Sequence, residues 1–272
     1  MISERFDTPG AVALDVKCAE GEIELETTDT AVTEVEVDAR GSDEAVRDLL
    51  EATRVELRNG REVIVHVPRR SGIFRRNVDV RIAIRAPEGA DVRVAAAAAD
   101  TRGRGRFGAF DVNSASGDVE VTAVAELEAK SASGDVRVGE VAGSASVNTA
   151  SGDVTLGRVG GALSANSASG DVTVREAAAE ATVSTASGDV GLDAVVQGRV
   201  KLRSASGDLE VGIARGSSVW VDARSLSGDT TSEVELGEGE PAGETGPLVQ
   251  LQAMTMSGDV TIRRAVERSV AG

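Results

Sequence analysis

The stretch "ANSASGDVTV" at residues 165–174 recurs with few changes along most of the chain. Close copies are "VNSASGDVEV" at 112–121, "AKSASGDVRV" at 129–138 and "VNTASGDVTL" at 147–156. In each copy a Ser-Gly-Asp turn joins two runs in which small or apolar residues alternate with polar ones, as in half-buried β-strands. The repeat therefore predicts a fold that stacks one short two-stranded unit many times.

The spacing of the repeat indicates the kind of stack. The aspartates at 135, 153, 171 and 189 follow one another in steps of 18 residues, a length typical of one solenoid coil. A left-handed hexapeptide helix would need an aliphatic side chain every sixth residue, but steps from Val154 reach Gly160 and Asn166. Right-handed crossovers are the default for parallel strands. We therefore predict an all-β fold, a right-handed parallel β-solenoid of about 18 residues per coil.

The repeat register extends towards the N-terminus in degenerate form. Asp100 lies 18 residues before Asp118, with Ala99 at the glycine position. Further back, "VKCAEGEIEL" at 16–25 aligns with the repeat and puts Cys18 at the position of a small hydroxyl residue. We expect both segments to form coils of the same kind.

Ser-Gly-Asp is expected to form the corner of each coil. Glycine supplies the positive φ that sharp turns require, and aspartate can accept a hydrogen bond from a nearby backbone N–H group. Stacked aspartates repel one another, so backbone donors or, as an alternative, bound Ca²⁺ should offset their charge. The predicted structural turn residues are Gly117, Asp118, Gly134, Asp135, Gly152, Asp153, Gly170, Asp171, Gly188, Asp189, Gly207, Asp208, Gly228, Asp229, Gly258 and Asp259.

Three domain segments are expected. Residues 1–95 form a strand-rich head and cap with one helix near 43–53, for which Ser42 is the expected N-cap. Residues 96–262 form the solenoid, interrupted by an acidic, glycine-rich loop at 232–247, and residues 263–272 form a tail. The last coil in the sequence, "LVQLQAMTMSGDVTI" at 248–262, is expected to end the stack and to be capped against end-to-end polymerisation.

A basic loop in the head is a candidate contact for a protein partner. The segment "RRSGIFRR" at 69–76 places four arginines around an apolar pair. It could receive an acidic partner, or it could be a solvated hairpin loop with no function. The candidate partner residues are Arg69, Arg70, Ile73, Phe74, Arg75 and Arg76.

Composition argues against several activities. The net charge of −16 makes nucleic acid an unfavourable partner, and no apolar run is long enough for membrane insertion. The only histidine, His66, alternates with valines as on a strand surface, and the only cysteine, Cys18, occupies an inward position. We predict no catalytic residues, no metal site and no cofactor.

The run of "SASGDV" coils at 114–260, which ends in "MTMSGDVTI" at 254–262, resembles the bacterial putative-adhesin family of β-strand-repeat proteins. The head resembles the same family through "SDEAVRDLLEATRVEL" at 42–57, "GREVIVHVP" at 60–68 and "VRIAIRAPEGADVRV" at 80–94. This resemblance implies a repetitive β fold, a function that is largely unknown and no catalytic motif.

The functional prediction is a non-enzymatic binding or scaffold protein that presents a repetitive acidic surface to an unidentified protein partner. Two alternatives stay open: a self-assembling scaffold similar to bactofilins, and a cell-surface adhesin exported by an unrecognised route. The chain lacks a recognisable signal peptide, so we expect a cytoplasmic protein. It should be a monomer or small homo-oligomer, with a polymer as the open alternative.

Overall fold

The computed structural model describes residues 1–69, 78–234 and 246–265. Apart from one helix, α1, its regular elements are β-strands, which confirms the predicted all-β, solenoid-like class. The chain divides into two compact units, Met1–Val138 and Gly139–Gly272. The domain limit expected at residue 95 falls within the long strand β7 (Asp91–Ser114).

The first unit is organised around one long strand, β2 (Ala13–Thr28). The N-terminal part of β2 pairs in parallel with β5, its C-terminal part pairs with β6, and β7 runs parallel along its other edge. β7 in turn pairs in parallel with β8. The other strands here are β1 (Ile2–Asp7), β3 (Val32–Arg40), β4 (Arg54–Arg58), β5 (Glu62–His66), β6 (Asp79–Pro87) and β8 (Val119–Ser131), and β9 (Val136–Val141) begins here.

The degenerate repeats take the predicted register in this unit. Gly21 pairs with Ala99, and Glu22 pairs with Asp100, in the β2–β7 ladder. The backbone N–H of Asp118 then bonds to the carboxylate of Asp100. The structure therefore confirms that residues 16–25 and the segment around Asp100 belong to the same series of coils as the clear Ser-Gly-Asp repeats.

Antiparallel pairing and a helix complete the first unit. β1 and β6 pair antiparallel with β3, and β4 pairs antiparallel with β5. The predicted helix is confirmed as α1 (Asp43–Ala52), which packs against β3 and buries Ala45 and Leu49. Ser42 occupies the N-cap position, but its side chain makes no capping hydrogen bond.

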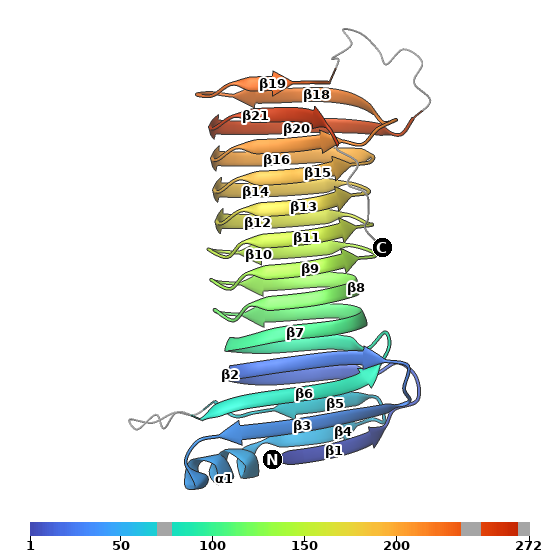
Figure 1. The fold of residues 1–272 in the computed structure, drawn as a ribbon, viewed down its shortest axis with the longest axis vertical. Coiled ribbons are helices and arrows are strands. Elements are labelled where there is room, and N and C mark those ends of the chain that lie inside the picture. The colour runs from blue at the N-terminus through green and yellow to red at the C-terminus, as the bar shows by residue number, and fades with distance from the viewer. Residues whose placement is uncertain (70–77, 235–245, 266–272) are drawn as a thin grey trace. The chain divides into compact units, whose positions relative to one another are not determined.

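The second unit is a stack of two-stranded coils (Figure 1). One ladder of parallel strands has the order β10, β12, β14, β16, β20, β18, and the other has the order β11, β13, β15, β17, β21, β19. The strands of the first ladder are β10 (Ala145–Thr149), β12 (Leu163–Ser169), β14 (Ala181–Ser187), β16 (Gly198–Ser206), β20 (Leu248–Ser257) and β18 (Ser218–Ser225). Those of the second are β11 (Val154–Val159), β13 (Val172–Ala177), β15 (Val190–Val195), β17 (Leu209–Ile213), β21 (Val260–Arg264) and β19 (Thr230–Ser232).

Inward-facing aliphatic side chains form the core of the second unit. As predicted from the alternation, Leu163, Ala165 and Val172 are buried, whereas Asn166 and Thr173 are exposed. Strict register stacks equivalent positions in columns of small and larger aliphatic residues. One such column contains Val147, Ala165, Val183, Leu202 and Ala253, all fully buried.

The coils do not stack in the order of the sequence. The coil of β20 and β21, last in the sequence, lies between the coil of β16 and β17 and the coil of β18 and β19 (Figure 1). The expectation that residues 248–262 end the stack is therefore wrong. The outermost coil of the second unit is residues 218–232, and its inward residues Val219, Val221 and Ala223 are only half-buried.

Candidate binding surfaces

A row of aspartates follows the Ser-Gly-Asp corners. In the second unit the backbone N–H of Asp171 donates to Oδ1 of Asp153 at 3.0 Å, and the N–H of Asp189 donates to Oδ1 of Asp171 at 2.9 Å. The same bond joins Asp208 to Asp189 at 2.8 Å. We call this row, Asp153, Asp171, Asp189, Asp208, Asp259 and Asp229, the aspartate ladder.

The first unit contains the same arrangement. The N–H groups of Asp118 and Asp135 donate to Oδ1 of Asp100 and Asp118, each at 3.0 Å. A backbone N–H group thus donates to one oxygen of each of these carboxylates. This arrangement is the one expected if backbone donors, and not bound Ca²⁺, offset the charge of the stacked aspartates. Among the described residues, no group of three or more acidic, histidine or cysteine side chains is arranged to hold a metal ion.

Close packing between coils explains the glycines of the motif. A Cβ atom on Gly170 would lie 2.5 Å from the carbonyl oxygen of Gly152, and one on Gly117 or Gly188 would overlap the carbonyl of the preceding coil. Among the corner glycines φ is positive only at Gly170, Gly207 and Gly258. The expectation that a positive φ requires glycine at every corner is therefore wrong, because at most corners the neighbouring carbonyl excludes a side chain.

A buried hydroxyl completes several corners. The backbone N–H of Gly117 donates to Oγ of Ser114 at 3.0 Å, and that of Gly152 donates to Oγ1 of Thr149 at 2.9 Å. The sequence contains a signal for this contact, because serine or threonine precedes these glycines by three residues. The serine or threonine and the glycine of each such corner therefore stabilise the turn, and the aspartate carboxylates are the groups exposed to solvent.

The two residues considered for enzyme chemistry have structural surroundings. His66 Nε2 lies 3.1 Å from Asp15 Oδ2 on neighbouring strands, and both side chains are partly buried. His66 is therefore an ion-pair or hydrogen-bond partner rather than a simple surface residue. Cys18 is 2% exposed, and burial raises the pKa of its thiol to about 11, so it is a poor nucleophile at neutral pH.

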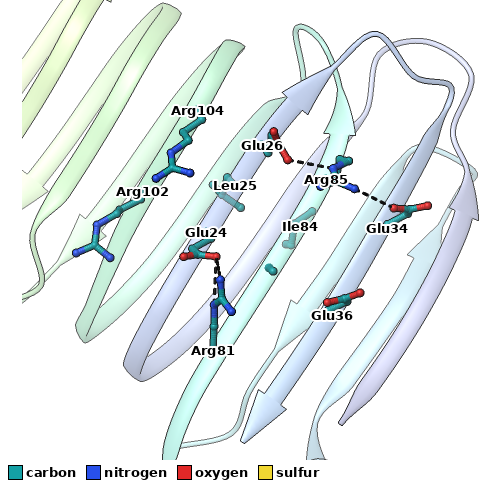
Figure 2. Close-up of a pocket in the computed structure, with 11 residues that line it drawn as sticks. Glu24, Leu25, Glu26, Glu34, Glu36, Arg81, Ile84, Arg85, Arg102 and Arg104 are labelled. Carbon is teal, nitrogen blue, oxygen red and sulfur yellow. Dashed lines mark hydrogen bonds and ion pairs between the residues drawn. The ribbon is translucent and has the colours of Figure 1, made fainter.

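A charged hollow of about 280 Å³ lies on the first unit (Figure 2). Arg81 Nη2 contacts Glu24 Oε2 at 2.5 Å, and Arg85 Nε contacts Glu26 Oε2 at 3.0 Å. Arg85 Nη1 also lies 3.7 Å from Glu34 Oε2. The hydrogen bonds that Arg81 and Arg85 donate to the carboxylates of Glu24 and Glu26 raise the pKa values of both arginines.

These charges compensate one another within the sheet. The pairs join β6 to β2 and β3, and a further pair joins Arg102 of β7 to Glu22 of β2. All are solvent-accessible, so each contributes little to stability. Cross-strand pairing of this kind supports the strand register and leaves little net charge to attract a ligand. The hollow is therefore a weak candidate for a binding site.

The predicted partner loop lies almost wholly outside the described residues. Arg69 is the only member of the candidate set within them. The loop stays a prediction.

A second candidate surface was missed by the sequence analysis. It consists of outward side chains of β16, β20 and β18, which we call the terminal face. In the earlier coils of this ladder the outward positions hold serine, threonine, asparagine or alanine, whereas here most are basic, aromatic, aliphatic, amide or thioether groups, with one acidic group, Asp222. The terminal face comprises Arg199, Lys201, Arg203, Trp220, Arg224, Leu226, Leu248, Gln250, Gln252, Met254 and Met256.

The stacked coils, with a repeated corner hydrogen bond and columns of small aliphatic side chains, define a β-solenoid repeat protein. The chain belongs to the Toastrack DUF4097 family, whose model matches residues 11–263. This is a domain family of unknown function, and the resemblance to bacterial putative-adhesin proteins is confirmed. No curated protein matches the chain.

Solved structures align with most of the chain at low identity. A putative adhesin from Bacteroides fragilis NCTC 9343 is 10% identical, with a TM-score of 0.45 and coverage of 97% of this chain and 96% of that one. A putative adhesin from Parabacteroides distasonis ATCC 8503 is 14% identical, with a TM-score of 0.46 and 96% coverage of each chain. A protein of the same organism described as a putative lipid binding protein is 13% identical, with a TM-score of 0.44 and 96% coverage of each chain.

These comparisons indicate no enzyme family. Within the described residues, α1 is too short and too polar to cross a membrane. The coarse conclusion is a repeat protein of the binding type.

Proposed function

We propose that this protein is a non-enzymatic binding or scaffold protein that presents the aspartate ladder to a protein partner. The supporting observation is the regular geometry of the ladder in the second unit. Each successive aspartate uses its backbone N–H to engage Oδ1 of the preceding one, and the ladder aspartates are exposed. The row of carboxylates is therefore both ordered and accessible.

The repeat of the ladder suits a multivalent ionic contact. Parallel strands lie about 4.8 Å apart, so a partner with basic side chains at a similar spacing could pair with several carboxylates at once. Individual exposed ion pairs contribute little, but several held on one rigid edge act together. Such an interaction should weaken strongly as the salt concentration rises.

The ladder proposal can be tested with charge-neutralised variants. The triple change Asp171→Asn, Asp189→Asn and Asp208→Asn keeps a side-chain acceptor for each backbone N–H and removes three charges. A matched control changes three acidic residues outside the ladder, Glu120→Gln, Glu180→Gln and Glu210→Gln. Proteins captured from lysate of the source cells by the native chain should be lost from the triple aspartate variant and retained by the control. Equal loss from both variants would show that net charge alone attracts them.

Self-assembly has one specific observation in its favour. In the described residues, β18 and β19 pair on one edge only, with β20 and β21. Free strand edges can pair with another chain, so a contact between copies at this end is the second candidate function. Light scattering over a range of micromolar concentrations tests it, and a constant monomer mass would exclude it.

Cytoplasmic location is part of the proposal. In that compartment the aspartate ladder would meet intracellular proteins. Fractionation of the source cells with an antibody against the chain tests it. Recovery at the cell surface would favour the adhesin alternative.

A further inference from the structure

Exposed apolar groups of the described residues concentrate on the terminal face. The described residues include six large hydrophobic side chains that are exposed to solvent. Five of them, all except Met1, belong to the terminal face. The set is Met1, Trp220, Leu226, Leu248, Met254 and Met256. Single exposed hydrophobic residues are common, but a cluster of this kind marks interaction surfaces.

The strand register brings these groups beside basic side chains. Gln250 of β20 pairs with Arg199 of β16 on one side and with Trp220 of β18 on the other. Met254 is flanked in the same way by Arg203 and Arg224. Because register partners project on the same side of a sheet, each of these two rows combines a cation with an aromatic, amide or thioether group. The row between them aligns Lys201, Gln252 and Asp222.

Two hollows are formed on this surface. One of about 520 Å³ is lined by Arg199, Lys201, Trp220, Leu248, Gln250 and Gln252. The other, of about 870 Å³, has Arg203, Arg224, Leu226, Met254 and Met256 in its lining. Both volumes are in the range of known ligand pockets, so the surface can receive groups that insert between its side chains.

The terminal face carries positive charge that the described residues do not neutralise. Arg224 pairs with Asp222 at 3.0 Å, but Arg199, Lys201 and Arg203 have no ion-pair partner in the part of the chain that the structure describes. This excess is unusual for a protein of net charge −16. An anionic partner would therefore be attracted to this surface and repelled by most of the rest.

We propose that the terminal face binds an extended acidic peptide segment that carries bulky apolar side chains. Arg199, Lys201 and Arg203 would pair with its carboxylates, and the two hollows would take its apolar side chains. Gln250 and Gln252 supply both donors and acceptors for a peptide backbone. Tryptophan, methionine and arginine are also the residue types enriched in protein interfaces.

A membrane surface fits these observations less well. Basic and apolar groups together do attract anionic lipids, but interfacial binding buries apolar side chains that project beyond the protein surface. Here the apolar side chains, although exposed, share their surface with Gln250 and Gln252, whose amides would lose their hydrogen-bond partners in a hydrocarbon interior. This site is separate from the aspartate ladder and does not depend on the ladder having a partner.

The position of Trp220 provides a direct measurement. It is the only tryptophan of the chain and is 53% exposed, so its fluorescence reports on the terminal face alone. The probe is a peptide of alternating glutamate and leucine that matches the 10 residues of β20. Two control peptides replace glutamate by lysine or leucine by serine. We expect a saturable blue shift with the glutamate–leucine peptide and an affinity at least about tenfold lower for both controls.

Variants separate a site from general charge attraction. The double change Lys201→Glu and Arg203→Glu should lower the affinity for the glutamate–leucine peptide by about tenfold or more. The control change Arg104→Glu and Arg175→Glu makes the same charge difference away from the terminal face and should leave the affinity nearly unchanged. Thermal unfolding measured by circular dichroism checks that each variant is folded.

Three results would overturn the proposal. These are equal affinity for all three peptides, equal weakening by both double variants, and no fluorescence change with the glutamate–leucine peptide. A blue shift with phosphatidylcholine–phosphatidylserine vesicles but not with this peptide would assign the surface to membranes instead. Retention of peptide binding in the triple aspartate variant would show that the two surfaces act separately.

Discussion

The backbone N–H of Asp259 donates to Oδ1 of Asp208, 51 residues earlier in the chain, at 2.8 Å. The N–H of Asp229 in turn donates to Oδ1 of Asp259 at 2.8 Å. The outermost coil of the second unit therefore comes earlier in the sequence than the last coil, which lies between it and the coil of β16 and β17. The terminal face exists only because of this insertion, since it places β20 between β16 and β18.

The composition of the two coils accounts for their order. The inserted coil has a full set of inward aliphatic side chains, including Val249, Leu251 and Ile262, all 0% exposed. The outermost coil has Thr230 and Ser232 in register with Val260 and Ile262. Because burial of an aliphatic side chain stabilises by roughly 1.5–3 kcal/mol, the more apolar coil gains more from two neighbours than the more polar coil would.

Engineered disulfides should test the coil order. Arg203 and Met254 are register partners on adjacent strands, and adjacent strands lie about 4.8 Å apart, within the Cα range of disulfides. We expect Arg203→Cys with Met254→Cys to oxidise readily, as judged by a shift on non-reducing gels. Arg203→Cys with Arg224→Cys is the control, because about two strand spacings separate those positions. Bridging of the control pair alone would mean that the coils stack in sequence order.

Two glycines allow a matched test of the close approach between coils. A Cβ atom on Gly188 would overlap the carbonyl of Gly170, whereas one on Gly191 meets nothing within 4 Å. Gly188→Ala should therefore lower the free energy of unfolding by about 1–3 kcal/mol, and Gly191→Ala should change it by less than about 0.5 kcal/mol. Urea unfolding of both variants gives the comparison. Equal midpoints would refute the steric explanation.

Two substitutions at Asp189 can separate the effect of the ladder hydrogen bond on stability from the effect of the ladder charge. Its Oδ1 accepts the N–H of Asp208 at 2.8 Å. Asp189→Asn keeps an acceptor and removes repulsion between neighbours, so its stability should equal or exceed that of the native chain. Asp189→Ala leaves the N–H without this partner and should be less stable than the asparagine variant by about 1 kcal/mol. Identical melting temperatures for the two variants would argue against a stabilising hydrogen bond.

Calcium should leave the stability unchanged. Backbone N–H groups already occupy one oxygen of the ladder carboxylates, and calcium needs six to eight oxygen ligands. We expect the same melting temperature in millimolar Ca²⁺ and in excess chelator. Because a ligand specific for the native state must raise stability, an increase of several degrees with Ca²⁺ would favour the metal interpretation.

The Cys18 thiol should be protected from alkylation in the folded protein, and its burial should make the stability of the fold decrease at alkaline pH. Burial raises the pKa of its thiol to about 11, whereas an unfolded thiol ionises near pH 8.5. As the pH rises, the thiol therefore ionises first in the unfolded state. The stability that Cys18 contributes is present below about pH 8.5 and is lost as the pH rises towards about 11. The free energy of unfolding falls by up to about 1.4 kcal/mol per pH unit in this range. Iodoacetamide at pH 8.5 should modify Cys18 only after denaturation. Cys18→Ala should show a smaller loss of stability over the same pH range.

Much of the local structure could be predicted because it is encoded by short-range patterns. The alternation around Leu163 and Val172 indicates which side chains face inward, and the fixed spacing of Ser-Gly-Asp sets the register of neighbouring coils. Asp100 and Gly21 could be assigned to degenerate coils for the same reason. The role of the corner glycines was harder to predict, because a carbonyl from the preceding coil, and not the local backbone angle, excludes the side chain.

The sequence by itself determined the all-β class, the coil length, the inward columns and the corner hydrogen bonds, since these depend on a repeat that every coil satisfies alike. Only the tertiary structure decided the order of the last two coils and, with it, the terminal face. Any two coils of the same register can pair through identical backbone groups, so the repeat does not specify which coil follows which. That choice depends on the total apolar surface buried between non-consecutive segments, and it brings Arg203, Met254 and Arg224 together on one surface.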